Sequence, residues 1–82
     1  MIKKKAELTP ELNVDQILKE IENEYRGKAE VTTIDGVKLD FPDKWVHLRK
    51  SNTEPIVRIY AEAQSTQEAE DIADEIIKKI ER

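Results

Sequence analysis

The apolar residues of this chain recur with two different periods, one typical of helices and one typical of strands. Over residues 14–25 and again over residues 69–80 they recur at steps of three and four, which predicts two amphipathic helices. The two apolar stripes are Val14, Ile17, Leu18, Ile21 and Tyr25 in the first segment and Ala69, Ile72, Ala73, Ile76, Ile77 and Ile80 in the second.

Polar residues mark the expected ends of both helices. Asn13 is placed to cap the first helix, with Gln16 at the capping-box position, and Ser65 and Glu68 stand in the same relation before the second. Gly27 is expected to end the first helix as a C′ residue.

Alternating apolar and polar residues predict extended strands in the rest of the chain. In one of them Val46 and Leu48 would lie on a buried face, and Trp45, His47 and Arg49 on the opposite face. The expected strands cover residues 2–8, 29–34, 37–41, 45–50 and 56–63.

The resulting order is strand, helix, four strands, helix, which predicts an α+β domain with two helices packed on one face of a mainly antiparallel sheet. Asp35-Gly36 is a hairpin signal between the second and third strands. Lys3, Lys4 and Lys5 suit an edge strand, because lysines there discourage pairing with other chains. The alternative is a basic tail for nucleic acid.

Composition narrows the functional classes. The chain has 82 residues and a net charge of −4, which fits one small domain and argues against a broad nucleic-acid or membrane footprint. It has no cysteine and a single histidine, so neither a disulfide framework nor a thiolate or histidine-cluster metal site is expected. No apolar run approaches the ~20 residues of a membrane span, and a cytoplasmic setting is expected.

A polar loop, residues 51–55, joins the last two expected strands and offers the strongest candidate chemistry. Ser51, Asn52 and Thr53 favour turns in which successive backbone N–H groups point the same way, and such a concave set of donors binds anions. Arg49 would add a planar fork that matches two phosphate oxygens. From the residues alone, an ordinary hairpin loop rich in turn formers is the favoured interpretation, and a site for a phosphate monoester is the alternative.

Four residues on the strands beside this loop have two interpretations each. Arg58 is either a second phosphate ligand or the cross-strand partner of a carboxylate. His47 is either an acid/base candidate or an ordinary surface residue. Trp45 and Tyr60 would stack on a sugar ring or a base, or else cover the exposed sheet face against a neighbouring domain.

The segment RKSNTEPIVRIYAEA, preceded by DGVKLDFPDKWVHL, closely resembles the C-terminal domain of the α-D-phosphohexomutase superfamily, most of all its phosphomannomutase/phosphoglucomutase branch. The resemblance covers nearly the whole chain. Its loop motif is specific: an arginine, one spacer, Ser-Asn-Thr-Glu-Pro, and an arginine three residues later. Phosphoglucosamine mutases usually have Ser-Gly-Thr-Glu-Pro there, so Asn52 favours the mannose/glucose branch, with a phosphoglucosamine mutase domain as the alternative.

This resemblance implies a fold similar to the TATA-binding-protein class, in the last of four domains around one cleft. Such enzymes interconvert hexose 1-phosphates and hexose 6-phosphates. The loop holds the non-reacting phosphate while a phosphoserine of the first domain exchanges phosphoryl groups with the sugar. If the family's roles are carried over to this sequence, that phosphate would be held by Arg49, Ser51, Asn52 and Thr53. Arg58 would be a further ligand. The implied partners are mannose or glucose phosphates and the other domains, with no nucleic acid or membrane.

The sequence lacks other motifs of that family: the phosphoserine motif, the aspartate-rich magnesium loop and the Gly-Glu sugar-recognition segment. Asp71, Asp74 and Glu75 have helical spacing and are expected to be solvated. No catalytic residue, metal ligand or cofactor is therefore expected in residues 1–82, and Mg²⁺ would be bound by a different domain. The chain is expected to be one domain excised from a larger enzyme and inactive alone. The remaining alternative is a protein- or RNA-binding module that uses the open sheet face.

Overall fold

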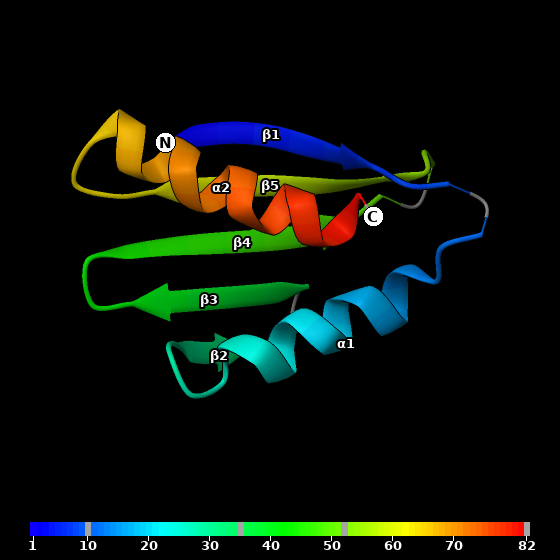
Figure 1. The fold of residues 1–82 in the computed structure, drawn as a ribbon, viewed down its shortest axis with the longest axis horizontal. Coiled ribbons are helices and arrows are strands. Elements are labelled where there is room, and N and C mark those ends of the chain that lie inside the picture. The colour runs from blue at the N-terminus through cyan, green and yellow to red at the C-terminus, as the bar shows by residue number, and fades with distance from the viewer. Residues whose placement is uncertain (10, 35, 52, 82) are drawn as a thin grey trace.

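The computed structural model describes residues 1–9, 11–34, 36–51 and 53–81, which form one five-stranded sheet and two helices (Figure 1). The predicted α+β class and the predicted order of elements are both confirmed. The elements are β1 (Ile2–Glu7), α1 (Val14–Tyr25), β2 (Glu30–Thr32), β3 (Val37–Phe41), β4 (Lys44–Lys50), β5 (Ile56–Glu62) and α2 (Thr66–Ile80).

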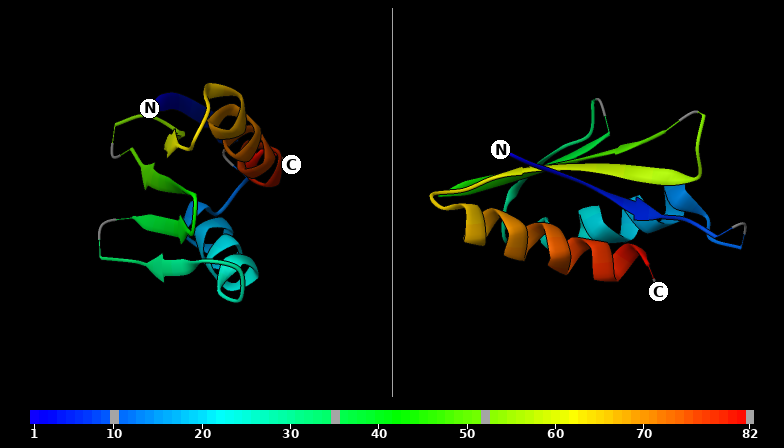
Figure 2. Two further views of the ribbon diagram at one scale, coloured as in Figure 1. Left: turned by 90° about the vertical axis from the view of Figure 1, so that its left-hand side faces the viewer. Right: turned by 90° about the horizontal axis from the view of Figure 1, so that it is seen from above.

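The strands lie in the order β1-β5-β4-β3-β2, and each neighbouring pair is antiparallel. β1 therefore occupies one edge of the sheet, as its lysines predicted. Both helices pack on the same face, as expected, and the opposite face carries no helix (Figure 2). We call that opposite side the open face.

The core lies between the helices and the sheet, and it follows the predicted apolar stripes. On the two central strands Val46, Leu48, Val57 and Ile59 are completely buried. The buried apolar helix residues are Ile17, Leu18, Ile21 and Tyr25 on α1 and Ala69, Ile72, Ala73, Ile76 and Ile80 on α2. Val14 and Ile77, at the margins of the two stripes, are half-buried.

Both predicted N-caps are confirmed. The Asn13 Oδ1 accepts a hydrogen bond from the backbone N–H of Gln16 at 3.2 Å. The Ser65 Oγ accepts from the backbone N–H of Glu68, also at 3.2 Å. Each bond satisfies one of the amides that a helix N-terminus leaves without an intrahelical acceptor.

The first helix ends where predicted, but not in the predicted way. Arg26 is the C-cap residue and Gly27 follows it, yet Gly27 lacks the positive φ that a left-handed C′ glycine has. Instead, the amides of Lys28 and Ala29 both donate to the Tyr25 carbonyl at 2.9 Å. A single carbonyl thus accepts both bonds, and no left-handed residue is needed.

The hairpin between β2 and β3 forms as its sequence signal predicts, although β2 covers only residues 30–32 of the expected 29–34. Asp35 lies outside the described residues. Gly36 has a φ of +75°, the left-handed conformation that glycine adopts readily. Its Cα lies so close to β4 that an added Cβ would stand 2.2 Å from the carbonyl oxygen of Leu48. The hairpin is therefore packed directly against the strand that leads into the polar loop.

Candidate phosphate-binding loop

The polar loop closes a hairpin between β4 and β5. Its base is set by the strand register, in which Lys50 faces Val57, and by the Ser51 amide, which donates to the Ile56 carbonyl at 3.1 Å. At the far side of the loop, the Leu8 amide donates to the Pro55 carbonyl at 2.8 Å. The loop is thus held between the end of β4 and the segment that follows β1.

Two amides of the loop converge on one oxygen atom. The Ser51 Oγ accepts from the backbone N–H of Thr53 at 3.3 Å and from that of Glu54 at 3.2 Å, and the Thr53 Oγ1 lies 3.4 Å from it. This is the local side-chain-to-backbone turn that serine favours. The amides of Thr53 and Glu54 therefore point to the same place, which the serine hydroxyl fills. The Ser51 amide, in contrast, is used in the hairpin base.

Two cations at the end of β4 come directly before the loop in the chain and border a hollow of their own. Arg49 is exposed, and its Cγ would lie 3.3 Å from a Cβ placed on Gly36. The Lys50 Nζ is 2.8 Å from the Oδ1 of Asp15, in the first turn of α1. A hollow of about 350 Å³ lies here, lined by Arg49 and Lys50 together with Asp15, Leu18, Thr33, Gly36 and Val37.

The strand register around Arg58 rules out one of the two interpretations that the sequence offers for this residue. In the strand register it lies directly opposite Arg49 on one side and Lys5 on the other, so its cross-strand neighbours are cations and not carboxylates. Among the described residues it has no carboxylate partner. The prediction of a cross-strand ion pair for Arg58 is therefore wrong.

Of the predicted phosphate ligands, the fold places the hydroxyls of Ser51 and Thr53 3.4 Å apart and sets Arg58 opposite Arg49 in the strand register. Asn52 lies outside the described residues. The sequence interpretation missed the amide of Glu54, although a serine three residues ahead of an amide in a polar loop is a known signal for this bond. It also missed the contact of Gly36 with β4, which depends on the strand register.

Three aromatic side chains, those of Trp45, His47 and Tyr60, lie on the open face. The rings of His47 and Tyr60, on directly opposite positions of β4 and β5, are 6.4 Å apart and tilted by 44°. The Lys38 Nζ lies 5.3 Å from the centre of the Trp45 ring. All three aromatic groups are half-buried by their neighbours on this face, which agrees with the interpretation that they cover the sheet.

Within the described ranges, no three histidine, aspartate or glutamate side chains are grouped to hold a metal ion. Three carboxylates of α2 are exposed and engaged singly: Asp71 accepts from Gln67, Asp74 from Lys4 and Glu75 from Tyr25. In the same described ranges, neither helix has the length and apolar character needed to cross a membrane.

Comparison with known proteins agrees with this architecture. Residues 3–79 match the family model described as the C-terminal domain of phosphoglucomutase/phosphomannomutase. The chain is 42% identical over 82 residues to a phosphoglucosamine/phosphogalactosamine mutase of Sulfurisphaera tokodaii, covering 99% of this chain and 18% of the relative. It is 38% identical over 72 residues to a phosphomannomutase/phosphoglucomutase of Pseudomonas syringae pv. tomato, covering 78% of this chain and 16% of the relative.

The crystal structure of a phosphoglucomutase/phosphomannomutase family protein from Burkholderia thailandensis has a similar fold, with a TM-score of 0.55 at 28% identity. That match covers 95% of this chain and 17% of the other. The fold and the loop thus define a phosphohexomutase domain. The chain belongs to the phosphoglucomutase/phosphomannomutase C-terminal domain family. It spans less than a fifth of the length of these relatives.

Proposed function

We propose that the loop between β4 and β5 binds the phosphate group of a hexose phosphate and anchors its non-reacting end while another part of the enzyme transfers the phosphoryl group. The observation that carries this proposal is the convergence of the Thr53 and Glu54 amides on one oxygen atom, in the loop that directly follows the strand carrying Arg49. A phosphate oxygen would replace the Ser51 hydroxyl as their acceptor. The displaced hydroxyl would then donate to the phosphate itself.

The donors divide into neutral and charged groups, which suits a phosphate monoester. The amides and the hydroxyls of Ser51 and Thr53 supply directional hydrogen bonds, and Arg49 supplies a bidentate cation. Asn52, which follows Ser51 in the sequence, and Arg58, opposite Arg49, are the further proposed ligands. Since binding at the remote phosphate positions the reacting end of the sugar, its free energy lowers the barrier to transfer elsewhere.

Such a loop recognises phosphate and not the sugar ring. A mutase must bind its substrate in two orientations, one for each half-reaction, and a loop with contacts only to phosphate accepts both. We assign the chain to the mannose/glucose branch from Asn52, with phosphoglucosamine as the alternative because relatives of both branches match. By itself the chain is expected to bind glucose, mannose and glucosamine 6-phosphates with similar affinity.

The test is an amide-shift titration of the ¹⁵N-labelled chain with glucose 6-phosphate. The amides of Ser51, Thr53 and Glu54 should shift first, with millimolar affinity, about −4 kcal/mol. Arg49→Ala should weaken binding about tenfold, because a charge-assisted bidentate contact is lost. Lys78→Gln, which removes a positive charge from the last turn of α2, on the helix side of the sheet, should leave the affinity unchanged.

The proposal fails if neutral glucose produces the same shifts as glucose 6-phosphate. It also fails if Arg49→Ala binds as tightly as the parent chain. A circular-dichroism melt of each variant separates a lost contact from a lost fold.

A further inference from the structure

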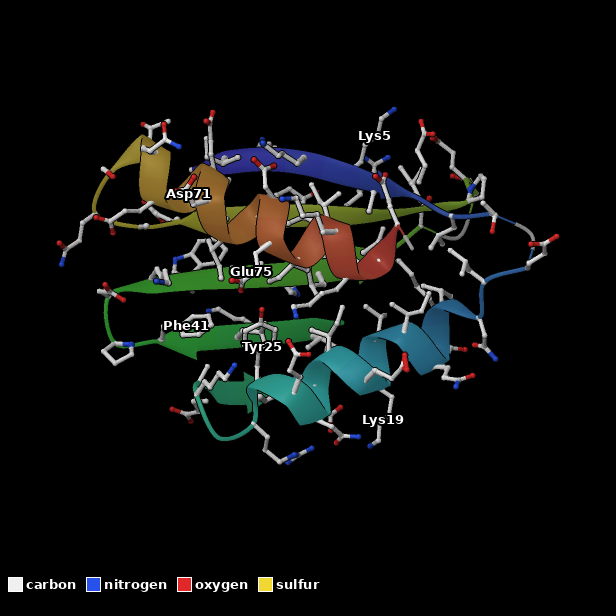
Figure 3. The ribbon with its side chains drawn as sticks, in the orientation of Figure 1. Lys5, Lys19, Tyr25, Phe41, Asp71 and Glu75 are labelled. Carbon is white, nitrogen blue, oxygen red and sulfur yellow. The ribbon has the colours of Figure 1, made fainter. Side chains whose placement is uncertain are left out.

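A row of cations crosses the open face next to the loop. Lys5 on β1, Arg58 on β5 and Arg49 on β4 stand directly opposite one another in the strand register. Lys3, two residues from Lys5 on the same face, stands opposite Tyr60. Neighbouring strands are about 5 Å apart, so these cations lie within one small area. Figure 3 shows Lys5 at the margin of the sheet, on β1.

Lys3, Lys5 and Arg58 make no ion pair with any residue in the described ranges. Lys4, between Lys3 and Lys5, does form an ion pair. Its Nζ lies 2.7 Å from the Asp74 Oδ1 on the helix side of the sheet. The chain thus pairs the lysine that faces α2 and leaves those on the open face without a carboxylate, although its net charge is −4.

This arrangement costs stability, since like charges directly opposite one another on neighbouring strands repel. The protection of an edge strand accounts for Lys3 and Lys5 but not for Arg58, because β5 has a strand on each side. An anion bound over Lys3, Lys5 and Arg58 would reduce the repulsion and would use all three of these cations.

We propose that Lys3, Lys5 and Arg58 form a second anion site beside the loop, for a small oligophosphate with two or more linked phosphoryl groups, with Arg58 shared between the two sites. The surface there forms a hollow of about 310 Å³, lined by Lys3, Lys4, Lys5, Arg58 and Tyr60. The two lysines act as point charges about 7 Å apart along the strand, and the arginine adds a planar fork between them and the loop. Linked phosphoryl groups place a negative charge near each of these cations. The ring of Tyr60 borders the site.

The experiment compares inorganic tripolyphosphate with inorganic phosphate in amide-shift titrations of the whole chain. Tripolyphosphate should shift the amides of residues 3, 5, 58 and 60, and added salt should weaken its binding. The double variant Lys3→Gln/Lys5→Gln should lower the tripolyphosphate affinity about tenfold or more, since two charge-assisted contacts are lost. The loop amides of this variant should still respond to phosphate.

A matched control removes the same charge from the helix side of the molecule. Lys19→Gln/Lys78→Gln, with Lys19 on α1 (Figure 3), should keep the full tripolyphosphate affinity. An equal loss in both double variants would show attraction to net charge alone and would overturn the site. Tripolyphosphate shifts confined to the loop would overturn it as well. Phosphate that failed to shift the loop of the parent chain would instead count against the proposed function.

Two sources of linked phosphoryl groups are distinguished by repeating the titration with ATP. A tighter affinity for ATP than for tripolyphosphate, accompanied by shifts of the Tyr60 ring, would identify the ligand as a nucleotide that stacks on this ring. Equal affinities would identify an inorganic chain. Either result requires the same three cations.

Discussion

At the scale of single residues, Gly36 connects the β2–β3 hairpin to the strand that carries Arg49. Its positive φ and its contact with the Leu48 carbonyl are independent reasons for glycine at this position. A side chain there would meet rigid backbone, which cannot move aside as the end of a flexible side chain could.

Gly36→Ala is therefore expected to lower the free energy of unfolding by about 2 kcal/mol or more, because alanine is strained at a positive φ and its Cβ would collide with β4. Urea unfolding followed by circular dichroism measures this change. The same variant should weaken hexose phosphate binding, since the end of β4 must shift to make room.

Gly27→Ala is the matched control for that variant. Nothing lies within 4 Å of the added Cβ, and φ is not positive. Alanine there should be neutral or should stabilise the chain by about 0.4–1 kcal/mol, by restricting the unfolded state. Similar losses in the two variants would contradict the structural difference between these glycines.

At the scale of elements, the two helices are joined by polar contacts above the core. The Tyr25 hydroxyl donates to the Glu75 Oε2 at 2.5 Å, and the Lys79 Nζ lies 2.6 Å from the Glu24 Oε2. Figure 3 shows Tyr25 and Glu75 facing each other between α1 and α2. The Tyr25 ring also meets Phe41 of β3 edge to face, at 5.9 Å between ring centres. Tyr25 thus ties both helices to the sheet.

Burial and the bond to Glu75 raise the pKa of Tyr25 well above its ordinary value. The stabilising contribution of the neutral hydroxyl is fully present below the unfolded-state pKa, about 10. Above that pH the unfolded state loses the proton first, so stability falls as pH rises toward the folded-state pKa. Tyr25→Phe should be about 1 kcal/mol less stable at pH 7 and should lose less stability between pH 9 and pH 11, roughly the range that brackets the ordinary tyrosine pKa.

Urea unfolding at several pH values tests this linkage. Glu75→Gln keeps an acceptor for the hydroxyl but removes the carboxylate charge. It should therefore show a loss intermediate between those of the parent chain and Tyr25→Phe. If the free energy of unfolding changed with pH in the same way in all three proteins, Tyr25 would not be the cause of the pH dependence.

The elements themselves could be predicted from sequence because each has a local signal. Both helices have an apolar stripe and a capping residue, and the strands alternate, so their order and buried faces are as expected. The end of α1 differs because one carbonyl accepts two amides, a choice that depends on the chain beyond the helix. Arg58 was misinterpreted for a related reason: its neighbours are set by the strand register, which places β1 beside β5.

The loop was predictable in composition but not in hydrogen bonding. The spacing of Arg49, Ser51 and Thr53 indicates anion chemistry, and the fold brings the hydroxyls of Ser51 and Thr53 together. The sequence could not show that the Ser51 hydroxyl itself accepts the amides of Thr53 and Glu54. Local acceptors compete with a ligand for the same donors, and only the backbone conformation decides which amides converge.

At the scale of the whole molecule, the domain presents its candidate chemistry on an exposed surface. The two helices occupy one face of the sheet (Figure 2), while the polar loop lies at one end of it. The strand register places the cations on the open face. Phosphoryl transfer needs a nucleophile held in line with the phosphorus and a site from which water is excluded. A surface loop supplies binding without either condition.

The 82-residue chain is accordingly expected to bind glucose 1-phosphate without converting it. Incubation with glucose 1-phosphate, a trace of glucose 1,6-bisphosphate and Mg²⁺, followed by ³¹P NMR, should show no glucose 6-phosphate above a protein-free control, while the loop amides shift in the same sample. Arg49→Ala serves as a check on contamination, because activity from a host mutase would survive this change. Conversion that disappears in Arg49→Ala would show that the chain carries its own nucleophile, and the anchoring role of the loop would then have to be extended to catalysis.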